Sequence, residues 1–276
     1  MDLIHPTAVI HSEARLDRGV SVGPYSVIEE NARIGENTRI LDRVTIARNT
    51  AIGKNNVIYT GAVLGREAQH REAATGETFL VIGDGNVIRE YVTIHRGLLD
   101  AERTTVVGNR NYFMAFSHVG HDCRVEDDIT LANAVLAAGH VTIQTGAVVS
   151  GGVVIHQYSR VGRYAMIGGL ARIPRDVPPY LLVDDGADAV RSVNLVGLKR
   201  AHFSEAAVRE IKKAYRLLYL SGLRLEEALE AILKECPGAE AKYLVDFIRN
   251  SKRGILSHVR EAQNPEGELK PSSAEE

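Results

Sequence analysis

An apolar residue recurs at every sixth position through the first two thirds of this chain, and no other feature of the sequence constrains the fold as strongly. The series runs in phase from Ile10 to Leu64 and from Ile82 to Ile94, and after a shift of one residue from Val107 to Ile173. A fixed short period of this kind indicates an architecture built from stacked repeats.

The residues around each of these positions indicate a short strand followed by a turn. The residue two places earlier is often small or β-branched, as at Ala32, Thr38 and Ala62, which implies the alternating inward side chains of a strand. The residue directly after is often glycine, as at Gly23 and Gly35, which suits a positive φ or a close backbone approach. Three six-residue units would form an 18-residue triangular coil that stacks on the next.

This pattern resembles the hexapeptide-repeat family, whose fold is a left-handed parallel β-helix. We therefore predict a mainly β protein, with such a helix of about eight coils over residues 1–180. Polar residues interrupt the repeat at about 66–80 and 96–105. We interpret both segments as loops, which commonly carry binding residues when they project from a rigid solenoid.

A crossover and a small α-helical C-terminal domain are predicted for residues 181–256. Ser204 is a suitable N-cap for a first helix with Gly222 as its end, the crossover covers about 181–196, and two further helices cover 225–236 and 239–252. The tail 257–276 is polar and is predicted to be disordered.

Composition and charge exclude several classes of protein. The 33 Lys and Arg residues nearly balance 35 Asp and Glu residues, so non-specific nucleic-acid binding is not expected. The sequence shows neither an apolar run long enough for a membrane span nor a secretion signal at its N-terminus. Cys123 and Cys236 lack any framework spacing, which fits reduced thiols and a cytoplasmic location.

Four of the ten histidines fall within one stretch of the repeat. Residues 18 apart stack in adjacent coils at about 4.8 Å, so His121, Gly139 and Gln157 form a column. The other three histidines are close to that column: His118, His140 and His156.

This cluster suggests acyl transfer. A histidine titrates near neutral pH and acts as a general base, and Asp122 is placed to orient His121 and to stabilise its imidazolium. Gly139 offers an unobstructed N–H to a developing oxyanion. Cys123 is expected to point inward as packing.

A zinc site was the alternative, because some left-handed β-helix enzymes resembling carbonic anhydrase bind zinc through a His-x4-His pair and a third histidine. The close pair here is His118-x2-His121, and no His-x4-His occurs. We therefore predict no metal.

Several motifs resemble the UDP-N-acetylglucosamine acyltransferases that begin lipid A biosynthesis. The matching segments are Thr93-Ile-His-Arg-Gly97, His118-Val-Gly-His-Asp-Cys123, Leu131-Ala-Asn133, Ala138-Gly-His-Val141, His156-Gln157, Asp176-Val-Pro-Pro-Tyr180 and Asn194-Leu-Val-Gly-Leu-Lys-Arg200.

The resemblance implies transfer of a 3-hydroxyacyl group from acyl carrier protein to the glucosamine 3-hydroxyl of UDP-N-acetylglucosamine, without metal or diffusible cofactor. It implies a homotrimer in which Asn194 and Arg200 reach a nucleotide at the neighbouring subunit's site. It assigns His121 as base, Asp122 as its orienting group and Gly139 as oxyanion donor. Residues assigned to substrate binding are His70, His95, His118, His140, His156 and Gln157.

Two further assignments have equally simple structural explanations. Gly169 matches a position that helps set acyl length in the family, but it also suits an ordinary turn after Gly168. A basic stripe on the first predicted C-terminal helix is a docking candidate for an acidic carrier protein, or a solvated helix face. The stripe consists of Arg209, Lys212, Lys213 and Arg216.

Four positions depart from the family pattern and leave the acceptor open. His70 and Glu72 replace an Asp and a Lys that usually contact substrate, Val196 replaces a common Glu, and Ala187 replaces an Asn. A different nucleotide sugar, including a 3-amino sugar, therefore remains an alternative acceptor. A non-enzymatic trimeric solenoid that binds an acidic partner is the second alternative.

Overall fold

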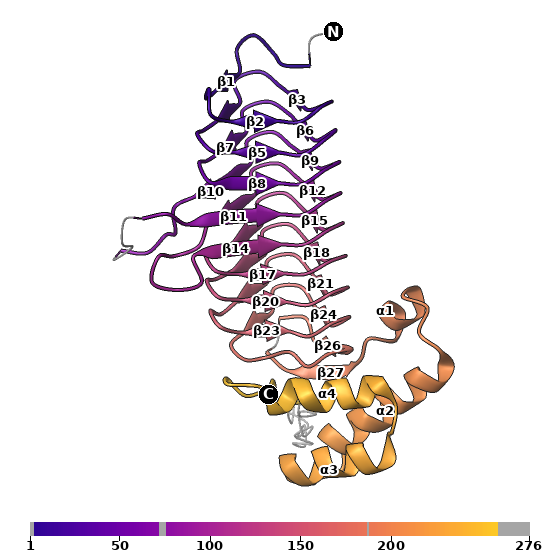
Figure 1. The fold of residues 1–276 in the computed structure, drawn as a ribbon. Coiled ribbons are helices and arrows are strands. Elements are labelled where there is room, and N and C mark those ends of the chain that lie inside the picture. The colour runs from indigo at the N-terminus through magenta and orange to yellow at the C-terminus, as the bar shows by residue number, and fades with distance from the viewer. Residues whose placement is uncertain (1–2, 72–75, 187, 259–276) are drawn as a thin grey trace, which may run out of the picture.

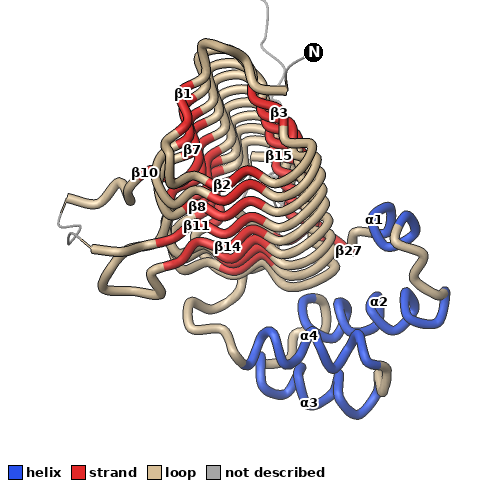
Figure 2. Tube along the Cα trace, turned by 45° about the horizontal axis from the view of Figure 1, so that its top comes forward, coloured by secondary structure: helices blue, strands red, loops and turns tan. Residues whose placement is uncertain are grey.

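The computed structural model describes residues 3–71, 76–186 and 188–258. Figure 1 shows a long stack of coils with a helical region at its carboxyl-terminal end, and Figure 2 shows its triangular cross-section. Within the described ranges, no helix has the length and apolarity needed to cross a membrane. The fold is the predicted left-handed parallel β-helix followed by a small helical region.

Three sheets form the faces of the β-helix. The nine-stranded sheet contains β1 (Val9–Ile10), β4 (Val27–Ile28), β7 (Thr45–Ile46), β10 (Val63–Arg66), β13 (Thr93–His95), β16 (His118–Val119), β19 (Leu136–Ala137), β22 (Val154–Ile155) and β25 (Arg172–Ile173). The eight-stranded sheet contains β2 (Arg15–Leu16), β5 (Arg33–Ile34), β8 (Thr50–Ile52), β11 (Phe79–Ile82), β14 (Thr104–Val107), β17 (Arg124–Val125), β20 (Thr142–Ile143) and β23 (Arg160–Val161). The ten-stranded sheet contains β3 (Ser21–Val22), β6 (Arg39–Ile40), β9 (Val57–Ile58), β12 (Val87–Ile88), β15 (Tyr112–Phe113), β18 (Thr130–Leu131), β21 (Val148–Val149), β24 (Met166–Ile167), β26 (Leu181–Val183) and β27 (Val190–Val193).

The apolar series forms the core of the β-helix. Ile46, Ile88 and Ile155 are fully buried, because each lies between the same position of the coil above and the coil below. Ile10 and Leu16 are only partly buried, because they belong to the first coil, which has no complete coil on its outer side.

The turns use both of the expected conformations, at different residues. Positive φ occurs mainly three residues after the apolar position, as at Tyr25, Asn31 and Asn37, and directly after it at Gly65. Gly23 instead permits the expected close approach of the backbone, since a Cβ there would lie 2.7 Å from the backbone of Leu41.

Both predicted loops project from one corner, and the strand pairing continues past them with one register shift, between Leu64 and Arg66. Val63 pairs with Thr93, and Thr93 pairs with His118, so the ladder continues across each insertion. The loops connect the nine-stranded to the eight-stranded sheet, and we call the edge where these sheets meet the loop corner (Figure 2). Glu72 lies outside the described residues.

A ladder of buried asparagines lies at the edge where the eight-stranded sheet meets the ten-stranded sheet. Asn56 Oδ1 accepts from the N–H of Asn86 at 2.8 Å, Asn86 Oδ1 accepts from Asn111, and Asn111 Oδ1 accepts from Ile129. Because these amides are buried, each depends on the next coil for its partner.

The C-terminal region differs from the prediction at its start. The ten-stranded sheet continues beyond residue 180 through β26 and the antiparallel β27, where a crossover was expected. Within residues 188–258, four helices follow, of which the first was not predicted: α1 (Leu195–Arg200), α2 (Glu205–Tyr219), α3 (Leu225–Glu235) and α4 (Ala239–Arg249). The Ser204 hydroxyl accepts from Ala207 N–H and caps α2 as expected.

Two arginines join the helices to the last coils. Arg163 pairs with Glu240 of α4, and Arg160 pairs with Asp176 and donates to the carbonyl of Phe247. Of the tail predicted to be disordered, residues 259–276 lie outside the described range, and His258 forms a bridge with Val190.

The asparagine ladder gives a stability prediction. Asn86→Ala should lower the free energy of unfolding by about 1–3 kcal/mol, because neighbouring buried polar groups lose their partner. Urea unfolding checks this against Asn250→Ala, an exposed change at the end of α4 that should cost less than about 0.5 kcal/mol. Equal losses in both variants would contradict a special role for the ladder.

Candidate active site

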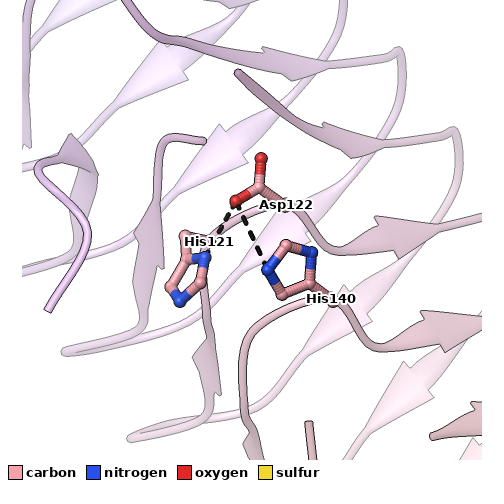
Figure 3. Close-up of side chains that lie close together, drawn as sticks. All are labelled: His121, Asp122 and His140. Carbon is pink, nitrogen blue, oxygen red and sulfur yellow. Dashed lines mark hydrogen bonds and ion pairs between the residues drawn. The ribbon is translucent and has the colours of Figure 1, made fainter. Parts of the chain in front are cut away.

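His121 and Asp122 form a hydrogen-bonded pair at the loop corner, between β16 and β17. Asp122 occupies a left-handed turn position with φ of 56°, which Asp tolerates better than most residues. Its Oδ2 lies 2.8 Å from His121 Nδ1 (Figure 3). The Asp122 side chain is fully buried, whereas the His121 side chain is 13% exposed, so the ring alone faces the surface.

The second loop holds Asp122 from two sides. Leu98 N–H donates to Asp122 Oδ2 at 3.0 Å and to Oδ1 at 3.3 Å, and the backbone N–H of Asp122 donates to Thr105 Oγ1 at 2.8 Å. Sequence reasoning missed both contacts. Their only signal was that Leu98 and Thr105 fall within the interruption at 96–105 on the same corner as Asp122.

Gly139 lies directly against the His121 ring. A Cβ built on Gly139 would lie 2.5 Å from His121 Nε2, so a larger residue would displace the ring. Among the described residues, none accepts a hydrogen bond from Gly139 N–H. With Nδ1 directed at Asp122, a free backbone donor and the outer nitrogen of the ring are thus adjacent.

His140 packs beside the pair. Its ring meets the His121 ring edge-on at 5.0 Å and stacks on Tyr158 at 4.4 Å, and its Nε2 lies 4.0 Å from Asp122 Oδ2. Burial lowers the pKa of His140, and His121 adds to this effect while Asp122 opposes it. The stacking role of Tyr158 was not predicted.

His118 and His95 extend the cluster toward the nine-stranded sheet. Their rings are 5.2 Å apart, and His118 Nδ1 shares a hydrogen bond of 2.8 Å with Thr93 Oγ1. Burial, reinforced by His95 and His121, lowers the pKa of His118 to about 4. Burial also lowers the pKa of His95, against a hydrogen bond with the Glu67 backbone.

His121, Asp122 and His140 each offer one metal-ligand atom, and these atoms lie within 4.8 Å of one another. This donor set is of a kind that zinc accepts. However, Asp122 Oδ2 already accepts hydrogen bonds from His121 and from Leu98 N–H. The contacts therefore fit an oriented base better than a metal centre.

The Cys123 thiol is fully buried and donates to the carbonyl of Ala138 at 3.1 Å. Burial raises its pKa to about 12. The inward, packing orientation predicted for Cys123 is confirmed, and the thiol is poorly suited to act as a nucleophile.

Known proteins resemble this chain in both halves. Residues 31–66 match the family model described as bacterial transferase hexapeptide (six repeats), and residues 176–256 match UDP-N-acetylglucosamine O-acyltransferase, domain 2. The acyl-[acyl-carrier-protein]–UDP-N-acetylglucosamine O-acyltransferase of Alkalilimnicola ehrlichii is 47% identical over 259 residues, covering 93% of this chain and 100% of that protein. The enzyme of the same name from Halorhodospira halophila is 43% identical over 257 residues, covering 93% of this chain and 100% of that protein. The chain belongs to the UDP-N-acetylglucosamine O-acyltransferase family.

Solved structures agree with this assignment. The UDP-N-acetylglucosamine acyltransferase of Bacteroides fragilis has a TM-score of 0.89 at 40% identity, covering 91% of this chain and 99% of that one. The Francisella novicida enzyme has a TM-score of 0.88 at 40% identity, covering 92% of this chain and 94% of that one.

The residues assigned through the acyltransferase family divide into two groups. His70 joins the cluster, with its ring 6.2 Å from that of His121. His156 and Gln157 are exposed at the same corner, and the His156 ring forms a hydrogen bond with the backbone carbonyl of Gln157. Gly169 is further along the stack and donates its N–H to Asp185.

The remaining acyltransferase-family positions lie in the helical region. Asn194 caps α1 by accepting from Gly197 N–H, and it donates to the Tyr164 carbonyl. Arg200 is exposed at the end of α1, and Val196 is 62% exposed. Ala187 lies outside the described residues. The basic stripe on α2 is exposed: Arg209, Lys212, Lys213 and Arg216.

The low pKa of His118 predicts a pH-dependent stability. Between about pH 6.5 and pH 4, His118 binds a proton in the unfolded state but stays neutral in the folded state. The free energy of unfolding therefore falls as pH falls through this window. In His118→Asn, the free energy of unfolding should decline less steeply over the same range. Urea unfolding at several pH values checks this, and identical slopes for both proteins would contradict it.

Proposed function

We propose that this chain transfers a 3-hydroxyacyl group from acyl carrier protein to the glucosamine 3-hydroxyl of UDP-N-acetylglucosamine, the first step of lipid A biosynthesis. The family and its full-length relatives support the reaction. The observation that carries the mechanism is the His121–Asp122 pair beside the free N–H of Gly139.

His121 acts as general base in this proposal. Asp122 accepts a hydrogen bond from the Nδ1–H group of His121, which leaves the lone pair of Nε2 to take the proton of the acceptor hydroxyl. The acceptor oxygen then attacks the thioester carbonyl. Gly139 N–H donates to the oxyanion that forms, and as the C–S bond breaks, the proton on His121 passes to the departing pantetheine sulfur.

The surrounding histidines supply a neutral polar lining. Because burial lowers the pKa values of His95, His118 and His140, these rings are uncharged near pH 7. They offer hydrogen bonds to the sugar without placing positive charge beside the base.

We also propose a homotrimer. His156, Gln157 and Arg200 make no described contact with the His121 cluster in their own chain, and in this proposal they serve a site that a second chain completes. An exposed apolar column at the corner between the ten-stranded and nine-stranded sheets supports burial by a neighbour. The column contains Tyr25, Tyr91, Phe116 and Leu170. Since Asn194 is engaged within its own chain, Arg200 is the better donor to a neighbouring nucleotide.

The stripe on α2 is the proposed dock for acidic acyl carrier protein. Arg209 pairs with Glu205 and Lys213 with Glu235, whereas Lys212 and Arg216 form no ion pair within the described part of the chain and remain available. The free, buried Cys123 and Cys236 are consistent with a cytoplasmic reaction.

Removal of the base tests the function. His121→Ala should lower turnover by about 10²–10⁴-fold, measured by mass spectrometry of products from UDP-N-acetylglucosamine and 3-hydroxyacyl carrier proteins. His11→Ala, an exposed change on a distant coil, serves as control.

A folded His121→Ala protein with undiminished turnover would refute the assigned base. If wild type forms no product with this acceptor but acylates a 3-amino analogue, the acceptor assignment is wrong. His70 supports this alternative acceptor, because it lies near His121 and replaces an Asp that usually contacts substrate in the family.

The position of Gly169 gives a prediction on acyl length. A Cβ at Gly169 would meet only the carbonyl of Gly151, at 3.7 Å, so a side chain fits without moving the backbone. Gly169→Met should therefore fold normally but favour shorter acyl chains than wild type. Competition between carrier proteins loaded with different chain lengths checks this, with Gly169→Ala as the smaller change. An unaltered preference would make Gly169 an ordinary turn residue.

A further inference from the structure

A buried arginine connects the two loops beside the His121 cluster. Arg96 is only 2% exposed. Its guanidinium donates to Thr78 Oγ1 at 3.0 Å, to the Gly65 carbonyl at 3.1 Å and to Glu67 Oε1 at 2.6 Å. All three acceptors flank the first loop, whereas Arg96 begins the second.

Backbone contacts make this connection stiff. Arg96 N–H donates to the carbonyl of Arg66, and Gly97 N–H donates to that of Phe79. A Cβ on Gly97 would lie 2.1 Å from the carbonyl carbon of Arg103, so the two arms of the second loop touch at the backbone. The first residues of this loop therefore have little freedom to move.

The connection leads directly to the catalytic pair. Leu98, two residues after Arg96, supplies the N–H that binds both oxygens of Asp122. On the other arm, Thr105 accepts from the backbone of Asp122. The carboxylate that orients His121 is thus held by a loop whose start is fixed by Arg96.

Burying a guanidinium costs desolvation free energy, so packing alone does not explain its place between two loops. Desolvation of an ion pair often offsets its attraction, and apolar residues of similar volume frequently serve stability as well. A planar group with several donors is favoured where geometry must be fixed. Arg96 uses its donors on one hydroxyl, one carbonyl and one carboxylate, which points to a geometric role.

We propose that Arg96 is a positioning residue for the acyl transfer: by joining both loops it holds Leu98 N–H on Asp122, and through Asp122 it sets the ring of His121. This inference rests on the proposed function. Arg160 offers a control, because it also forms an ion pair and a hydrogen bond with a backbone carbonyl, but it lies at the junction with the helices.

A double-mutant cycle tests the coupling. Arg96→Met should lower kcat by about 10–100-fold, as expected for a misplaced catalytic group. In an Asp122→Asn background, the same change should cost less than about threefold, because the group that Arg96 positions has already lost its function. Arg160→Met should change kcat by the same factor in both backgrounds. Independent, multiplying effects of Arg96→Met would overturn the proposal.

The pH profile supplies a second readout. The groups facing His121 are Asp122, His70, His95, His118 and His140. If Asp122 is released, the imidazolium loses its stabilising carboxylate, and the acid limb of kcat/KM should move to lower pH in Arg96→Met, toward that of Asp122→Asn. If Arg96→Met lowers kcat/KM but leaves the acid limb at the pH of wild type, its role is purely structural and the proposal is overturned. Arg160→Met should leave the acid limb at the pH of wild type.

Two further measurements distinguish a positioning role of Arg96 from a folding defect, and distinguish failure of this proposal from failure of the proposed function. Arg96→Lys keeps the charge but not the planar donors, so it should fold like wild type and show a smaller loss of kcat. Hydrogen exchange of the Leu98 amide, which needs no turnover, should accelerate at least about tenfold in Arg96→Met. Unchanged exchange would refute the positioning role, whereas a wild-type protein without turnover would refute the proposed function alone.

Discussion

The backbone hydrogen bonds between consecutive coils are the interaction on which the rest of this structure depends. Each short strand is too small to be stable alone, and it exists because its N–H and C=O groups pair with the coils on either side. The six-residue apolar period follows from this stacking, since every coil must present the same side chain to the same interior line. The asparagine ladder applies the same rule to polar groups.

The chemistry of the candidate site depends on the same register. His121 and Gly139 are 18 residues apart in sequence, and stacking places a glycine directly over the imidazole ring. Asp122 occurs at the left-handed turn position of its coil, which directs its carboxylate inward beside the ring. A regular scaffold thereby fixes three groups relative to one another, while the irregular loops add the surroundings that a turn alone cannot supply.

The period of the sequence was sufficient to predict stacked coils and their interior, because one residue in six must be apolar wherever coils stack, and the resemblance to the hexapeptide-repeat family implied the left-handed β-helix. It was also sufficient to bring His121, Gly139 and His140 together. The contacts of Leu98, Thr105 and Arg96 were not predictable in this way, because they arise from loops that do not follow the period. Helix α1 was missed because its six residues are too few for an apolar stripe. Of the two explanations for the glycine that follows the apolar residue, the close backbone approach applies at Gly23 and Gly35, whereas positive φ occurs mainly two residues later in the turn.

The two ends of the solenoid differ, and the difference bears on how the molecule opens. Ile10 and Leu16 in the first coil are only partly covered, whereas the last coils are joined to α4 through Arg160 and Arg163. Thermal opening should therefore begin at the amino-terminal coils and travel along the stack one coil at a time. Several complete coils separate that end from His121. The terminal coils can therefore unfold and refold locally while the histidine cluster stays intact.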